Sequence, residues 1–277
     1  MTAVWGASAR TDVARTIDHT EIETAAGFER MLSVLREEGI VIVRGFSREA
    51  ADLVAFAQRV GTPEPGVLGD GSLTPDQPMY WVNDVSSKKK PSEVLKQHTA
   101  GAHQAVEPTI HLLLMVDKAD PEFADADIDN GQSQFSRVDD AVARMSSMFG
   151  EAAAEAALEL LLETPISTEF PADSPRVDPI LTRGSDGTWA FRYWGRVREH
   201  AVKGGLTEEQ IEALRMFDEA LNAEKFEFVM EKGDLVVLDN RRTAHGRRAF
   251  PAYEQAADGT QVESRRRIFN MHISGAI

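Results

Sequence analysis

Two histidines and a run of arginines, far apart in the sequence, are the side chains best suited to bind a metal and an organic anion. His98 lies in the segment Gln97–Ala100, and His245 lies 147 residues later, beyond the apolar run Leu235–Leu238. Three consecutive arginines, Arg265–Arg267, follow. The sequence contains no cysteine, so disulfides and thiolate metal sites are excluded. A metal would need histidine, carboxylate or water ligands, a set that suits iron(II).

The order of these motifs resembles that of the taurine dioxygenase and clavaminate synthase-like superfamily of non-haem iron(II), 2-oxoglutarate-dependent oxygenases. The matching strings are His-x-Ala at His98, a Gly-Asp strand leading through Asp239–Arg242 to His-Gly-Arg at His245, and Arg-Arg-Ile-x-Asn from Arg266. The run Gly39–Phe46, between two predicted helices, resembles the start of the same superfamily. The resemblance implies Fe(II), 2-oxoglutarate and O2 as cofactors.

The resemblance also implies that His98 and His245 bind the iron. In an extended segment residues i and i+2 point the same way, and the superfamily carries its carboxylate ligand two residues after the first histidine. Ala100 stands in that position here. An alignment shifted to His103 restores no acid, and Glu107 has the wrong spacing for an extended ligand pair. The sequence therefore predicts a vacant carboxylate position beside the iron.

An alanine at this position resembles the halogenase variant of the superfamily. Removing the carboxylate opens a coordination position and removes one negative charge, and a chloride ion restores both. We therefore expect a halogenase that uses chloride to chlorinate an unactivated C–H bond of a small polar substrate, such as a free amino acid. Two other interpretations stay open. One is a hydroxylase that has water in the gap or whose acid has been replaced by engineering at Ala100, and the other is a non-catalytic binding relative.

Arg267 matches the arginine that holds the distal carboxylate of 2-oxoglutarate in the superfamily. Arginine suits this role because its planar guanidinium binds a carboxylate through two hydrogen bonds and keeps its charge when buried. The interval from His245 to Arg267 is longer than usual, so Arg266 is a second candidate. Ser133 could donate its hydroxyl to the same carboxylate. Met271 stands where a taurine-binding enzyme would have an arginine, so taurine is not the expected substrate.

Four further residues are candidates for substrate contacts. Trp81 and Asn83 precede the first metal-binding segment, in a region that often covers the active site of related enzymes. Arg192 and Trp194 lie near a strand that faces the iron in the superfamily. The other histidines are expected to have structural roles: His103, His111, His200 and His272.

The composition is that of an ordinary soluble protein, with 42% hydrophobic and 27% charged residues. The formal net charge of −15 argues against binding to nucleic acid, whose phosphates would be repelled. No apolar stretch approaches the roughly 20 residues of a membrane span, and the first residues do not form a signal peptide. We expect a cytoplasmic protein with a small-molecule substrate and no membrane partner. The sequence does not determine the oligomeric state.

Predicted strands are spread along the whole chain, with helices at the front and inserted between them. This order favours an α+β or mainly β fold in which helices flank an antiparallel jelly roll. The resemblance specifies the cupin-like double-stranded β-helix, and we expect one oxygenase-type domain over residues 1–277. The clearest local predictions are strands at Gly39–Phe46, Thr109–Val116 and Leu235–Leu238, a short strand at Met79–Val82, and a helix at Val138–Leu162.

Overall fold

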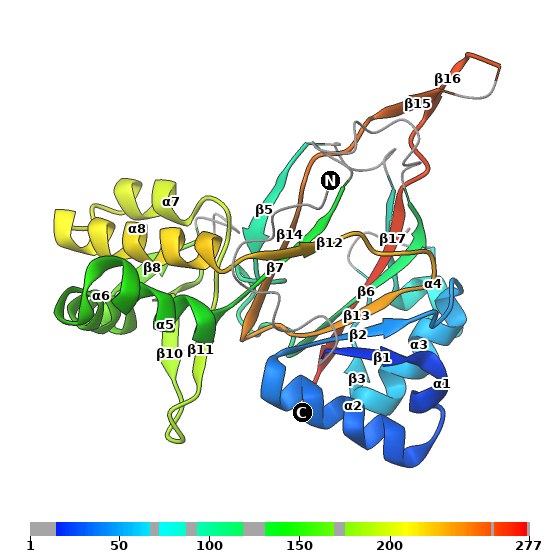
Figure 1. The fold of residues 1–277 in the computed structure, drawn as a ribbon, viewed down its shortest axis with the longest axis horizontal. Helices are drawn as coiled ribbons and strands as arrows, with labels where there is room; N and C mark the ends of the chain where they lie inside the picture. Colours follow the sequence, from blue (N-terminus) through cyan, green and yellow to red (C-terminus); the bar gives the residue numbers. More distant parts are fainter. Residues whose placement is uncertain are drawn as a thin grey trace.

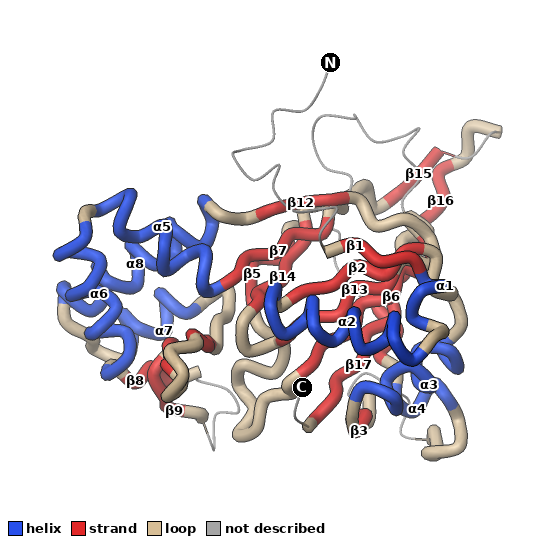
Figure 2. Tube along the Cα trace, turned by 60° about the horizontal axis from the view of Figure 1, so that its bottom comes forward, coloured by secondary structure: helices blue, strands red, loops and turns tan. Residues whose placement is uncertain are grey.

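Two β-sheets face each other in this computed structural model, which describes residues 15–66, 72–86, 93–118, 131–168, 175–255 and 258–275. One group of helices, from the N-terminal part of the chain, lies against the larger sheet (Figure 1). A second group of helices projects beyond the smaller sheet (Figures 1 and 2).

The larger sheet is formed by strands from both ends and the middle of the chain. Its order is β1 (Thr16–Asp18), β2 (Ile40–Arg44), β13 (Leu235–Asp239), β6 (Ile110–Asp117), β17 (Arg267–Ser274) and β3 (Thr62–Pro63), with β4 (Asn83–Ser86) also paired to β17. The pairing of β1 with β2 is parallel, and the other pairings in this sheet are antiparallel. Because β2, β13, β6 and β17 have neighbours on both sides, they are the central strands of the sheet.

The smaller sheet has the order β12 (Phe226–Phe228), β7 (Ser133–Arg137), β14 (Thr243–Arg247) and β5 (Leu95–His98), and all its pairings are antiparallel. Its register places His245 directly opposite His98 on one side and Phe135 on the other. The candidate metal histidines are therefore cross-strand neighbours.

Alternation along the central strands separates two hydrophobic cores. On β13, Leu235 and Val237 contact the helices outside the larger sheet, whereas Val236 and Leu238 point toward the smaller sheet. Phe135 of β7 joins this inner core. A strand buried on both faces needs apolar residues at every position, which explains the unbroken apolar run of β13.

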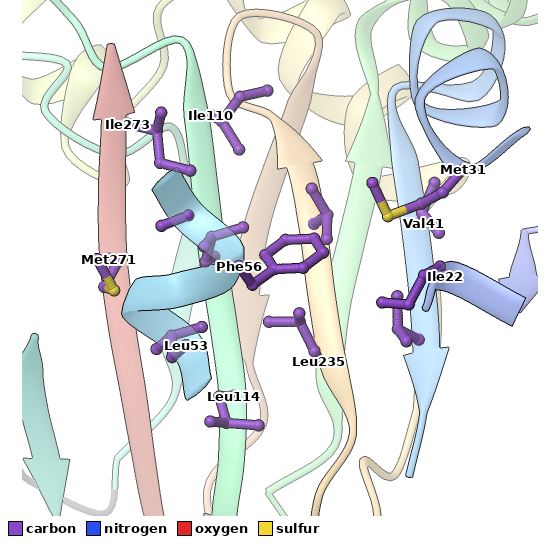
Figure 3. Close-up of a cluster of buried hydrophobic side chains, with 14 of the residues drawn as sticks. Ile22, Met31, Val41, Leu53, Phe56, Ile110, Leu114, Leu235, Met271 and Ile273 are labelled. Carbon is purple, nitrogen blue, oxygen red and sulfur yellow. The ribbon is translucent and has the colours of Figure 1, made fainter. Parts of the chain in front are cut away.

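Helices α1 (His19–Ile22), α2 (Ala25–Glu38), α3 (Ala50–Val60) and α4 (Pro78–Trp81) lie on the outer side of the larger sheet, where Phe56 and Met31 pack against the strands (Figure 3). Gly39 ends α2 with a φ of 70°, a conformation that side chains with a Cβ rarely adopt. The short strand predicted at Met79–Val82 is wrong: Pro78 begins a helical turn there.

The second group of helices comprises α5 (Val138–Phe149), α6 (Glu151–Glu163), α7 (Val197–Lys203) and α8 (Glu208–Ala223). They share a core of their own with the strand pairs β8 (Pro165–Ser167) and β9 (Val177–Pro179), and β10 (Leu181–Arg183) and β11 (Trp189–Phe191). The single helix predicted over Val138–Leu162 is instead two helices, because Gly150 between them has a φ of 88°.

A further hairpin, β15 (Tyr253–Gln255) and β16 (Gln261–Glu263), extends away from both sheets (Figure 1). The architecture confirms the predicted α+β fold with a jelly-roll, cupin-like core flanked by helices, although the two sheets do not close into a barrel. None of the helices in the described part of the chain combines the length and apolar character needed to cross a membrane.

Candidate active site

The two predicted metal histidines lie side by side between the sheets. His98 ends β5 and His245 is central in β14, and their ring centroids are 4.2 Å apart. Nδ1 of His98 lies 2.9 Å from the carbonyl oxygen of Lys96. A neutral ring that donates from Nδ1 to this carbonyl leaves Nε2 with a free lone pair, which is the form that binds a metal.

His111 and His272, for which the sequence predicted structural roles, extend this pair into a cluster of four imidazoles. The ring of His111 stacks on that of His245 at 4.5 Å, and His272 lies 5.0 Å from His111. His111 shares its strand face with Leu113, which belongs to the inner core. The alternation along β6 could have predicted from the sequence that His111 lies on the inner face. The position of the smaller sheet, which brings this face close to His245, could not be predicted in this way.

The pKa of each of the four imidazoles is lowered, which favours the neutral form. Burial lowers the pKa of His98, His111, His245 and His272, and repulsion between the rings lowers the pKa of His111 and His245 further. Among the described residues, neither ring nitrogen of His111 nor Nδ1 of His245 has a hydrogen-bond partner. A neutral imidazole keeps one unprotonated nitrogen, and a nitrogen of this kind is a suitable metal donor.

The adjacent rings of His98 and His245 could supply two protein ligands to a metal. Within the described ranges, no three His, Asp or Glu side chains are arranged around a common metal position. His98 and His245 therefore have no described acidic neighbour to complete a facial triad. Glu107 instead forms an ion pair with Arg176 at 2.9 Å, and burial raises the pKa of its carboxyl group.

Ala100 is fixed by a buried asparagine that sequence reasoning did not single out. Its N–H donates to Oδ1 of Asn240 at 2.7 Å, and Nδ2 of Asn240 donates to the carbonyl oxygens of Ala100 and Pro108 at 2.9 and 3.0 Å. The methyl group of Ala100 is buried, with 6% of the residue exposed. Asn240 thus ties the segment after His98 to the end of β13.

The structure places Arg267 away from the histidines. Its guanidinium makes two hydrogen bonds to Asp84, at 2.9 and 3.0 Å, and its side chain is 42% exposed. It also lies on the strand face of Phe269, which packs in the outer core. Its charge is therefore already paired with an acid on the neighbouring strand.

Arg266, the second candidate, is the buried arginine of this run. It is 6% exposed, and its guanidinium lies over the ring of Phe250, as does that of Arg247. Burial and the nearby charge of Arg247 lower the pKa of Arg266 to about 9. No described carboxylate forms an ion pair with Arg266, so an organic anion would relieve an unfavourable burial of charge.

Ser133 and Arg247 face each other across β7 and β14, and both are buried. They lie two residues from Phe135 and His245, respectively, so they share the inner face of the smaller sheet. Arg266 passes close to Gly131, where an added Cβ would be 3.0 Å from its Nε. Arg247 was not predicted as a site residue, although it belongs to the His-Gly-Arg string.

The four predicted substrate residues lie in different places. Asn83 is buried and donates from Nδ2 to Oδ1 of Asn270 at 2.9 Å, on the inner face of β17. Trp81 donates to the carbonyl of Pro75 and packs against the outer core. Arg192 and Trp194 make their contacts beside the second group of helices. The guanidinium of Arg192 donates to the carbonyl oxygens of Ile166, Asp178 and Pro179. The indole N–H of Trp194 donates to Nδ1 of His200.

Comparison with known proteins adds independent findings. Residues 2–267 match the family described as "Taurine catabolism dioxygenase TauD, TfdA family". A search of curated proteins finds no match. An asparagine oxygenase in complex with Fe(II), 3-hydroxyasparagine and succinate superposes with a TM-score of 0.63 at 18% identity, over 92% of this chain and 82% of the other.

Two other solved structures are similar. A taurine dioxygenase from Burkholderia xenovorans gives a TM-score of 0.62 at 18% identity, covering 94% of this chain and 86% of that one. The non-haem iron oxygenase OrfP, in complex with Fe and α-ketoglutaric acid, gives 0.62 at 16% identity, covering 90% and 79%. At these identities the structural likeness speaks for the fold.

Proposed function

Because the chain belongs to the TauD/TfdA dioxygenase family, whose chemistry depends on iron(II) and 2-oxoglutarate, we propose that it halogenates a small polar substrate. Two observations carry this proposal: the rings of His98 and His245 are adjacent, and a buried alanine, Ala100, stands two residues after His98 with no described acid to complete the ligand set. Iron(II), 2-oxoglutarate and oxygen together supply the oxidising power that breaks an unactivated C–H bond.

His98 and His245 are the proposed iron ligands. Their rings are adjacent, their surroundings keep them unprotonated, and the carbonyl of Lys96 orients His98. His111 stacks on His245 and limits the rotation of its ring. We assign His111 a positioning role, since its ring packs on that of a ligand.

Arg266, rather than Arg267, is the residue we propose for the distal carboxylate of 2-oxoglutarate. Arg266 is buried without a described acidic partner, whereas Arg267 is occupied by Asp84. Arg247 adds a second positive charge, and Ser133 opposite it can donate a hydroxyl hydrogen. A charge-assisted pair of this kind is short, strong and orienting.

Ala100 supports chloride as the additional ligand. A carboxylate at this position would bring one negative charge to the metal, and chloride brings the same charge without a side chain. The side chain of Asn240 makes two hydrogen bonds to backbone groups of Ala100, and these hold the alanine in place.

An amino acid is the substrate class that we propose. The amide pair Asn83 and Asn270 offers polar groups on the inner face of the larger sheet, on the side of His272. The product bound in the asparagine oxygenase, 3-hydroxyasparagine, is an amino acid as well. That hydroxylated product also favours a second candidate function, in which this chain hydroxylates and water fills the position beside Ala100.

Two measurements test the proposal. Anaerobic titration of the protein with iron(II) and 2-oxoglutarate should produce a weak visible charge-transfer band, and His98→Ala or His245→Ala should abolish both the band and stoichiometric iron binding. Absence of the band from the unmodified protein would favour a non-catalytic relative.

Turnover of free amino acids should then be followed by mass spectrometry with and without chloride. We expect a chlorinated product that requires chloride, its loss in Ala100→Asp, and its retention in Ala100→Gly, which keeps the position open. Hydroxylated product alone at saturating chloride would contradict halogenation. If Ala100→Asp also raised the hydroxylation rate, the chain would be a hydroxylase that lacks its acid.

A further inference from the structure

A cleft of about 1020 Å³ lies on the opposite side of the smaller sheet from the histidines. Its walls come from β5 and β7 of the sheet and from α7 and α8, and Figure 1 shows these helices beside the strands. Gln97 and Gln134 line it from the sheet. Gln134 is next in sequence to Phe135 of the inner face, so it points outward. Gln97 lies where the register of β5 against β14 shifts, and both Gln97 and Lys96 line the cleft there.

The side-chain amide of Gln97 is the group in this cleft that most clearly indicates a bound ligand. The residue is only 5% exposed, and neither the oxygen nor the nitrogen of its side-chain amide has a hydrogen-bond partner among the described residues. A buried donor or acceptor without a partner costs about 1–3 kcal/mol. By contrast, the amide of Gln134 donates to Glu227 at 2.6 Å. One amide of the cleft is thus satisfied within the protein, and the other presents both a donor and an acceptor.

The charge of the cleft is opposite to that of the chain. Three acidic side chains line it, and each has a basic partner in the cleft: Glu199 with Arg196 at 2.9 Å, Asp218 with Arg198 at 3.9 Å, and Glu227 with Arg248 at 2.6 Å. Three lysines also line the cleft, Lys96, Lys203 and Lys225, and Lys225 lies 3.6 Å from Glu227 as a second cation beside that carboxylate. The lining therefore carries a positive excess in a chain whose net charge is −15. Such an excess attracts anions.

Apolar side chains occupy the rest of the wall. Val94 and Val202 are 57% and 59% exposed, and Val197 and Ile211 line the cleft beside them. A ligand that covered the exposed valines would bury apolar surface and gain roughly 25 cal/mol for each Å² removed from water.

From these three features we propose that the cleft binds a small organic anion that carries an amide group and a short apolar group. The ligand's amide would pair with the donor and acceptor of Gln97, its apolar group would cover Val94 or Val202, and its anionic group would lie near Lys225. N-acylated amino acids have all three groups. This site is separate from the proposed iron site, because the sheet lies between them.

N-acetyl-L-leucine is a suitable probe, and calorimetric titration of the full chain is the measurement. We expect saturable binding at one site. Two analogues serve as controls: 4-methylpentanoate keeps the charge and the apolar group but lacks the amide, and N-acetyl-L-leucinamide lacks the charge. Each should bind about tenfold more weakly or worse, since each loses hydrogen bonds or a charge interaction.

Variants separate the outer cleft from the iron site. Gln97→Leu should weaken binding about tenfold through the loss of two hydrogen bonds, and Lys225→Gln should weaken it and reduce its dependence on salt. Lys232→Gln, the same charge change beside Asp117, should have no effect. Arg266→Leu and added 2-oxoglutarate should also leave the affinity unchanged.

The proposal is overturned if the probe shows no saturable binding, or if Gln97→Leu binds it as tightly as the unmodified protein. Displacement of the probe by 2-oxoglutarate would place it at the inner arginines and would overturn the proposal too. Because binding is measured without turnover, these outcomes are independent of whether the chain halogenates.

Discussion

The two faces of the smaller sheet carry different chemistry on the same strands. On the inner face, His98 and His245 bring adjacent imidazoles of lowered pKa next to the packed ring of Phe135. On the outer face, Gln97 and Gln134 line an open cleft with a positive excess. Since alternate residues of a strand point to opposite sides, neighbours one position apart can be changed separately to test each face.

At Gly246, next to His245, the backbone of β5 lies so close to β14 that there is no space for a side chain. A Cβ added there would be 2.7 Å from the carbonyl oxygen of Leu95. The register of β14 against β5 also shifts between His245 and Arg247. The glycine after the histidine thus permits the close approach of the strand that carries His98.

The largest expected effect concerns Arg266, the arginine that we propose for 2-oxoglutarate. Arg266→Leu removes a buried charge that we pair with 2-oxoglutarate, and loss of such a pair costs about 2–5 kcal/mol. The affinity for 2-oxoglutarate should fall roughly 30-fold or more by the same measure, as read from the charge-transfer band during titration. Arg267→Leu, which loses only its half-exposed pair with Asp84, is the matched control. A larger loss in the control would return the role to Arg267.

Packing provides the next contrast between the faces. Phe135 is fully buried between the sheets, so Phe135→Ala should lower the free energy of unfolding by about 3–5 kcal/mol. Gln134→Ala removes one hydrogen bond to Glu227 on the outer face and should cost about 1 kcal/mol. Denaturant unfolding of the two variants measures the difference. Equal losses would mean that the outer face is packed as tightly as the inner one.

Asn240→Ala tests how the segment after His98 is held. The change leaves the backbone groups of Ala100 and the carbonyl of Pro108 without their described side-chain partner. Since each unsatisfied buried group costs about 1–3 kcal/mol, thermal or denaturant unfolding should show a loss of about 2–4 kcal/mol. Asn222→Ala, on exposed helix surface, should change stability little. An equally small effect at Asn240 would mean that the segment is held by other contacts.

The sequence predicted the central strands of the fold well, because a strand that is buried on both faces leaves a recognisable run of apolar residues. Leu235–Leu238 and Leu112–Val116 are apolar at successive positions, as strands buried on both faces must be, and β13 and β6 are found there. The Gly150 break and the turn at Pro78 were missed, since one glycine or proline decides them against a wider apolar pattern.

The candidate site was only partly predictable. Motif order brought His98 and His245 together in expectation, and the structure places them as cross-strand neighbours. His272 lies directly opposite His111 on the paired strand β17, whereas the approach of His111 to His245 depends on two sheets facing each other, a long-range contact that no local pattern encodes. The choice between Arg266 and Arg267 depends on which face of the sheet each arginine meets where β17 begins. A sequence alignment cannot decide this, because the interval between His245 and these arginines differs in length from that of the superfamily.

The smallest expected effect is an increase in the free energy of unfolding, whereas the changes at Phe135, Gln134 and Asn240 should lower it. In the absence of ligand, the buried amide of Gln97 lacks described partners, and replacing such a group by an apolar one of similar size is neutral or stabilising. Gln97→Leu should therefore raise the free energy of unfolding by up to about 1 kcal/mol, whereas Gln134→Leu should lower it by losing the bond to Glu227. Denaturant unfolding of the two matched variants decides the sign. If both changes destabilise alike, the Gln97 amide is already satisfied within the folded protein, and the outer face holds no unmet hydrogen-bonding groups for a ligand.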